Sequence, residues 1–80
     1  MSQDFRAPLR DYITAELMRD PGYPLGDDEP IITAGLIDSL SLAQLAIFIE
    51  EQFGIVIPDP DLTVDNMNTL DQIVARVQQG

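Results

Sequence analysis

The chain has 80 residues, enough for one small domain over residues 1–80 but not for a second core. It is 45% hydrophobic and contains neither cysteine nor histidine. These absences exclude disulfides, thiolate and imidazole metal ligands, and Ser–His or Cys–His nucleophilic machinery. Because so short a chain also leaves little room for a deep substrate cavity, we expect a protein that is not an enzyme.

Fourteen acidic residues stand against four basic residues, and the formal net charge is −10. Such a surface repels nucleic acid, whose binding needs a cationic footprint, and attracts proteins that carry basic patches. The N-terminus has no basic segment followed by an apolar run, and no stretch approaches the ~18 apolar residues of a membrane span. We therefore expect a complete, monomeric cytoplasmic protein that binds neither nucleic acid nor membranes.

The first predicted helix runs from Asp4 to Arg19, with Ser2 or Asp4 as its N-cap. Apolar residues recur along it every four positions, as on a helix that packs against a core: Phe5, Leu9, Ile13 and Leu17. Residues 20–37 then form a long loop with three prolines and three glycines. Its apolar side chains are expected to enter the core and pin the loop: Tyr23, Leu25, Ile31, Ile32, Leu36 and Ile37.

The second predicted helix runs from Ser39 to Phe53, a stretch without proline or glycine. Asp38 is a favoured N-cap, and Gly54 ends the helix. Five apolar residues fall within a narrow arc and form the predicted core stripe: Leu42, Leu45, Ala46, Ile49 and Phe53.

The opposite face of this helix carries three further apolar residues, Leu40, Ile47 and Phe48. Polar residues surround them: Gln44, Glu50 and Glu51. One interpretation is that the helix lies centrally and is buried on several sides. The other, which we favour, is an exposed apolar patch where a partner protein docks.

The remaining elements complete an all-α fold. Residues 55–57 form an extended connector with buried isoleucines, which Pro58 ends. Residues 61–67 allow a short helix, and Thr69 caps a last helix that continues to Val77. Its apolar residues have helical spacing: Leu70, Ile73, Val74 and Val77. The sequence thus predicts a four-helix bundle of three main helices and one short helix, with a long first loop.

Acidic residues offer no convincing catalytic or metal site. The pairs Asp27-Asp28 and Glu50-Glu51 are typical of solvated charge outside any pocket. A calcium loop that starts at Asp59 fails because Val64 stands where glycine is needed and Leu70 where a bidentate glutamate belongs. We therefore assign no catalytic residue and no metal ligand.

Ser39 follows Asp38 at the point where the apolar loop enters the second helix. Both residue types are favoured helix caps, so capping alone explains them. The same place also suits a phosphate ester, because an anion there faces backbone N–H groups and the positive end of the helix dipole.

A set of residues spread along the chain resembles the acyl and peptidyl carrier protein family. The matching residues are Gly35-Leu36-Ile37-Asp38-Ser39-Leu40, then Leu42, Leu45, Ile49, Glu50, Glu51, Phe53 and Gly54, then Ile57-Pro58-Asp59, and finally Thr69, Leu70 and Ile73. The resemblance implies that a phosphopantetheinyl transferase esterifies Ser39 with 4′-phosphopantetheine from coenzyme A. The terminal thiol of this group would hold an acyl or aminoacyl cargo as a thioester, and Asp38 would assist recognition by the transferase.

The resemblance also implies partners. Leu40, Ile47, Glu50 and Glu51 lie on the helix that family members present to an acyl- or aminoacyl-activating ligase and to downstream biosynthetic enzymes with basic docking patches. Neutral Ser41 and Gln44 and apolar Phe48 depart from fatty-acid carriers, so we favour a stand-alone carrier in a specialised, natural-product type of pathway. A fatty-acid synthesis carrier is the alternative. An acidic helical adaptor or inhibitor without a prosthetic group is the alternative from another class.

Overall fold

The structure is a computed structural model that describes residues 4–79. Helices and loops make up this range, and it contains no strand. The elements are α1 (Arg6–Tyr12), the π-helical η1 (Ile13–Leu17), α2 (Ser41–Phe53), the 3₁₀-helical η2 (Asp59–Asp61), α3 (Val64–Met67) and α4 (Leu70–Gln79). The predicted all-α fold with three main helices and one short helix is confirmed.

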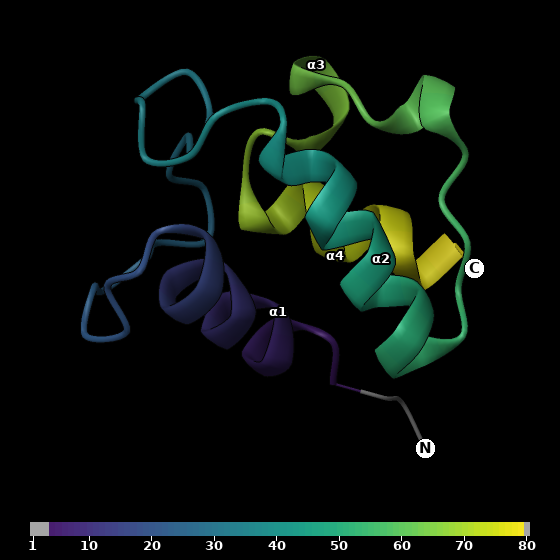
Figure 1. The fold of residues 1–80 in the computed structure, drawn as a ribbon, viewed down its shortest axis with the longest axis horizontal. Helices are drawn as coiled ribbons and strands as arrows, with labels where there is room; N and C mark the ends of the chain where they lie inside the picture. The colour runs from purple at the N-terminus through teal and green to yellow at the C-terminus, as the bar shows by residue number, and fades with distance from the viewer. Residues whose placement is uncertain (1–3, 80) are drawn as a thin grey trace.

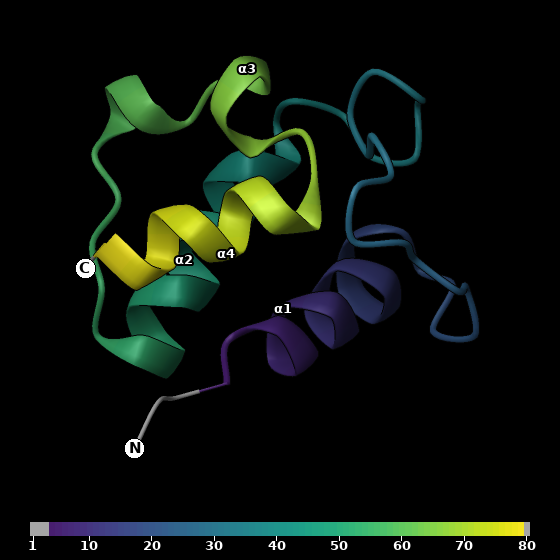
Figure 2. The same ribbon diagram turned by 180° about the vertical axis from the view of Figure 1, so that it is seen from behind.

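The helices surround a shared apolar centre. The buried side chains of α2 and α4 belong to one cluster, and α1 lies beside these two helices on the side of the long first loop in the two opposite views (Figures 1 and 2). The long first loop and the segment that connects α2 to η2 lie on opposite sides of the molecule (Figure 1). Every helix in this range except η2 contributes to the core. Within the described residues, no helix is both long and apolar enough to cross a bilayer.

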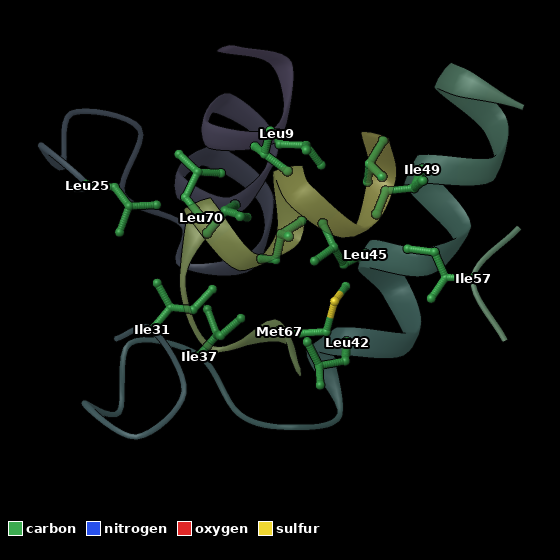
Figure 3. Close-up of a cluster of buried hydrophobic side chains, with 14 residues drawn as sticks. Leu9, Leu25, Ile31, Ile37, Leu42, Leu45, Ile49, Ile57, Met67 and Leu70 are labelled. Carbon is green, nitrogen blue, oxygen red and sulfur yellow. The ribbon is translucent and has the colours of Figure 1, made fainter. Parts of the chain in front are cut away.

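The core consists of buried aliphatic side chains and one methionine from the helices and loops. These are Leu9, Ile13, Leu25, Ile31, Ile37, Leu42, Leu45, Ile49, Ile57, Met67, Leu70, Ile73, Val74 and Val77. Leu45 lies near its middle (Figure 3). Full burial of each such side chain stabilises the fold by roughly 1.5 to 3 kcal/mol, which explains why the long loop is held in place. Of the six loop side chains predicted to enter the core, Leu25, Ile31 and Ile37 are buried, and the other three, Tyr23, Ile32 and Leu36, are partly buried and pack against the cluster.

Two of the predicted helix caps are present at the helix starts. Asp4 Oδ1 accepts a hydrogen bond from the Arg6 backbone N–H at 3.0 Å. Thr69 Oγ1 accepts from the Gln72 N–H, while Gln72 Oε1 accepts from the Thr69 N–H, each at 3.1 Å. The last pair forms a reciprocal capping box, which fixes the first turn of α4. Ser2, the alternative cap of the first helix, lies outside the described residues.

The end of the first helix differs from the regular α-helix that the sequence predicts. Residues 13–17 have π-helical hydrogen bonding, and the Met18 N–H donates to the Ile13 carbonyl at 2.8 Å. Thr14 is buried, and its hydroxyl donates back to the Arg10 carbonyl at 2.9 Å. Arg19 then takes a left-handed conformation with φ of 57°, a position that glycine usually fills. Leu17, in the widened turn, is only partly buried, whereas Leu9 and Ile13 of the same stripe are fully buried.

Asn68 fastens the middle of the long loop in a way that the sequence pattern did not reveal. Its Oδ1 accepts from the backbone N–H groups of Ile32 and Thr33 at 3.0 and 3.1 Å. Its backbone carbonyl accepts from the Ile31 N–H at 2.7 Å. One residue between α3 and α4 thus satisfies three backbone donors of the loop.

Ion pairs also hold the same loop, at Asp27. Asp27 Oδ1 lies 3.0 Å from Arg6 Nη1 and also pairs with Arg10. Arg6 Nη1 bonds Asp71 Oδ1 at 2.7 Å, and the Asp71 backbone N–H donates to the Asp27 carbonyl at 2.9 Å. α1, the loop and α4 are therefore joined by charge as well as by packing.

Candidate functional site

Ser39 lies in the turn that leads into α2. Before it, Ile37 is buried, and its N–H donates to the Ile31 carbonyl at 2.9 Å, so the chain is anchored at this point. The three residues that follow, Asp38, Ser39 and Leu40, are exposed. The functional segment is therefore a short exposed turn between a core anchor and a long helix.

Asp38 caps α2, as predicted. Its Oδ1 accepts from the Ser41 backbone N–H at 3.0 Å and from the Ser41 hydroxyl at 3.1 Å. The backbone carbonyls of Asp38 and Ser39 accept from Ser41 and Leu42 at 3.1 and 3.2 Å, which gives a tight turn before the helix. α2 consequently begins at Ser41 and not at Ser39, which corrects the predicted boundary by two residues.

The hydroxyl of Ser39 takes no part in this cap. It forms no hydrogen bond with the described residues, and the side chain is exposed. The Asp38 carboxylate provides the cap, so no hydrogen bond among the described residues depends on a hydroxyl at position 39. This leaves a free nucleophilic oxygen at the end of a rigid helix.

An open hollow of about 650 Å³ adjoins Ser39. Leu17 of η1, Ile32 and Leu36 of the long loop, and Val64 of α3 line it together with Ser39. These four apolar side chains are half-buried and leave part of their surface free. A long group with amide and methyl portions, esterified to Ser39, fits here because no described side chain covers the hydroxyl and both apolar and polar surface adjoin it.

Most residues of the predicted docking face are exposed on α2. Leu40 exposes 80% of its surface and Ile47 exposes 55%, values that are large for apolar residues. Gln44, Glu50 and Glu51 are exposed as well. The interpretation that the apolar residues on this side of the helix are buried is wrong for Leu40 and Ile47.

Phe48 does not belong to the exposed part of the predicted docking face. It is half-buried, and its ring stacks on Tyr12 of α1 with centroids 4.1 Å apart and an interplanar angle of 17°. Its edge contacts Phe53, whose ring in turn contacts Phe5. Consecutive residues on a helix point about 100° apart, so Phe48 turns toward α1 while Ile47 faces solvent. The expectation that Phe48 is exposed beside Leu40 and Ile47 is wrong.

Val56 is an exposed apolar residue that the sequence analysis missed. It exposes 65% of its surface, whereas its neighbour Ile57 is buried. Val56 and Ile47 line one hollow with Glu50 and Asp59. Alternation along the extended segment 55–57 could have indicated it, because neighbouring side chains of extended chain point to opposite sides.

Within residues 4–79 no group of three or more His, Cys, Asp or Glu side chains is placed to hold a metal ion. Asp61, one of the residues considered for a calcium loop, is instead paired with Arg76 at 3.0 Å.

Comparison with known proteins agrees with this geometry. Residues 7–77 match the model of the phosphopantetheine attachment site family. The chain belongs to this family. It is therefore a non-catalytic carrier, and its prosthetic group is covalently bound 4′-phosphopantetheine.

Similar proteins include D-alanyl carrier proteins. The carrier is 29% identical over 76 residues to one from Bacillus velezensis, a match that covers 95% of this chain and 96% of the relative. It is 35% identical over 52 residues to one from Streptococcus pyogenes, which covers 65% and 66% of the two chains. A chain in a solved structure described as the crystal structure of an FAD-dependent dehydrogenase has the same fold, with a TM-score of 0.71, 25% identity, and coverage of 86% of this chain and 97% of that chain.

Proposed function

We propose that the chain is a stand-alone carrier that holds biosynthetic intermediates on a 4′-phosphopantetheine arm attached to Ser39. The Ser39 oxygen forms a bond to the phosphorus next to the pantetheine portion of coenzyme A. The pyrophosphate bond of coenzyme A breaks, adenosine 3′,5′-bisphosphate leaves, and the proton of the hydroxyl passes to the transferase or to solvent. The bound group supplies a thiol that holds the cargo as a thioester.

The observation that carries this proposal is the free hydroxyl of Ser39 at the start of α2. Asp38 and Ser41 satisfy the cap, so esterification at position 39 costs the fold no hydrogen bond. An arm on a rigid helix end lets one intermediate reach several enzymes at high effective concentration. The four apolar side chains beside Ser39 offer the arm a resting surface when no enzyme holds it.

Asp38 is proposed to serve the transferase as well as the fold. Its Oδ1 accepts both hydrogen bonds from Ser41, while Oδ2 has no partner among the described residues. An exposed carboxylate oxygen next to the reacting hydroxyl is available to a metal-bound active site. We therefore assign Asp38 to transferase recognition.

The exposed face of α2 is the proposed docking surface for partner enzymes. Leu40 and Ile47 supply apolar contact, and Gln44, Glu50 and Glu51 supply polar and acidic surface. With a net charge of −10, the carrier is attracted to basic patches on a phosphopantetheinyl transferase and an activating ligase. Val56 extends this surface across the hollow that it shares with Ile47.

We infer an aminoacyl cargo because the relatives are named for D-alanine. A specialised biosynthetic pathway in the cytoplasm remains the proposed setting, and fatty-acid synthesis is the alternative for the pathway. An adaptor without a prosthetic group is the alternative for the whole function, and replacing Ser39 separates the two. An adaptor would keep its activity in a Ser39→Ala variant that folds normally, whereas a carrier would lose it.

Isolation of the carrier from its own cells tests the cargo. Intact-mass measurement, followed by release of the arm in the gas phase, gives the mass of the group held on the thiol. A mass increment equal to an amino acid supports the proposal. Increments that match a ladder of fatty acyl chains would favour the alternative pathway, and a chain that is never modified in its own cells would favour the adaptor.

A further inference from the structure

A second surface, which we call the α1–α2 hollow, lies on the side of α2 that faces α1. It is an open hollow of about 410 Å³. Tyr12 of α1 and Phe48 of α2 contribute their stacked rings, and Asp11 and Glu16 contribute carboxylates beside them. Gln52 lines the α2 side. The hollow is thus an aromatic pair with acidic neighbours.

No ion pair within residues 4–79 involves the acidic groups at the α1–α2 hollow. Within residues 4–79 the ion pairs use Asp27, Asp61 and Asp71, and neither Asp11 nor Glu16 takes part in one. Burial first, and then the charges of Glu16 and Glu51, raise the pKa of the Tyr12 phenol above its ordinary value. Glu16 and Glu51 therefore place the Tyr12 ring in a negative potential.

We propose that the α1–α2 hollow binds an arginine side chain of a partner protein. A guanidinium group stacks flat on an aromatic ring, and its N–H groups can donate at the same time to carboxylates at the ring edge. The stacked pair of Tyr12 and Phe48 offers the ring surface, and Asp11 and Glu16 offer the acceptors. This surface does not include Leu40 or Ile47. A partner could therefore contact α2 both at the α1–α2 hollow and at the exposed face that carries Ile47.

Other occupants fit the α1–α2 hollow less well. An aliphatic side chain would cover the carboxylates without offering them a donor, which costs free energy. An anionic group would be repelled by the same charges. A lysine carries a compact, strongly hydrated charge that cannot stack as a plane.

Nuclear magnetic resonance of the ¹⁵N-labelled apo chain tests the proposal. The probes are the acetylated and amidated tripeptide Ala-Arg-Ala and its counterpart with citrulline, which has nearly the same shape but no charge. With the arginine peptide we expect shift changes centred on Tyr12, Phe48 and Gln52. The δ-methylene protons of the arginine should move upfield because they lie over a ring face. The citrulline peptide should bind at least about fivefold more weakly.

Two charge-matched double variants identify the acceptors. Asp11→Asn with Glu16→Gln should weaken arginine-peptide binding about fivefold. Asp28→Asn with Asp65→Asn removes the same charge from exposed positions elsewhere and should leave the affinity unchanged. Equal binding of the citrulline peptide, equal losses in both double variants, or shift changes centred on Leu40 and Ile47 would overturn the proposal. The apo chain is used, so these results do not depend on modification of Ser39.

Discussion

Ile47 and Phe48 are adjacent apolar residues on α2, yet they have different surroundings. Ile47 exposes 55% of its surface, whereas Phe48 is half-buried against the ring of Tyr12. Hydrophobicity alone does not distinguish them. What distinguishes them is the neighbour: α1 supplies Tyr12 on one flank of α2, and nothing in the described chain covers the flank of Ile47 to the same degree. The proposed docking surface depends on this difference, because Ile47, Leu40 and Val56 are the large apolar side chains that the described fold leaves exposed.

The largest loss of stability from a substitution in α2 is expected on its core side. Leu45 has no exposed surface and lies at the centre of the buried cluster. Leu45→Ala should lower the free energy of unfolding by roughly 2 to 5 kcal/mol, because the lost contacts leave a cavity. Urea unfolding followed by circular dichroism measures the change. A loss below about 0.5 kcal/mol would mean that Leu45 does not face the core.

The same substitution at the two neighbouring residues tests the comparison itself. Phe48→Asp should cost roughly 2 to 4 kcal/mol, since it removes the stack on Tyr12 and places a charge at a half-buried position. Ile47→Asp should change the free energy of unfolding by no more than about 0.5 kcal/mol. Its effect should instead appear as weaker binding to a transferase or ligase in a titration by calorimetry. Equal losses of stability in the two variants would refute the distinction.

Removing the capping carboxylate at the start of α2 should lower stability less than the substitutions of Leu45 and Phe48 do. Asp38→Ala should cost about 1 kcal/mol because the Ser41 N–H loses its acceptor. It should also slow loading by the transferase at unchanged coenzyme A concentration. Ser41→Ala is the control, since it removes only the hydroxyl bond and leaves the carboxylate in place. If both variants load at the wild-type rate, Asp38 has no role beyond capping.

The ion pairs of Asp27 should give the smallest effect, visible as a dependence on pH. Desolvation by itself would raise the pKa of Asp27. Hydrogen bonds and charges from Arg6 and Arg10 outweigh it and hold this pKa below its ordinary value of 3.8. This contribution to stability is present above the unfolded pKa and is lost as pH falls through the folded pKa. Asp27→Asn should therefore flatten the acid limb of a plot of melting temperature against pH. An Asp28→Asn control should keep the wild-type slope, and identical curves for the two variants would contradict the assignment.

Much of the fold follows from local signals in the sequence. Periodic leucines and isoleucines predicted the core, Asp38 and Thr69 predicted caps, and Gly54 takes the left-handed conformation that its position requires. These features depend on residues close together in the chain, so spacing and residue type suffice.

Other features depend on contacts between distant segments and were not predictable. Phe48 is covered only because Tyr12 lies 36 positions earlier on a neighbouring helix. Asn68 binds a loop whose backbone course no pattern fixes. The π-helical turn comes with a hydrogen bond from the Thr14 hydroxyl to the Arg10 carbonyl and with a left-handed Arg19, and regular apolar spacing reveals neither of them. The candidate site was located through the resemblance of residues spread along the chain to carrier proteins, because Asp38 and Ser39 by themselves predict only a helix cap.

Attachment of the prosthetic group at Ser39 is tested most directly by intact-protein mass spectrometry. Wild type, Ser39→Ala and Ser41→Ala are incubated with coenzyme A, magnesium and a broad-specificity phosphopantetheinyl transferase. One phosphopantetheine on wild type and on Ser41→Ala, and none on a folded Ser39→Ala, is the predicted result. Modification of Ser39→Ala, or an unmodified wild type with several transferases that load a control carrier, would contradict attachment at Ser39.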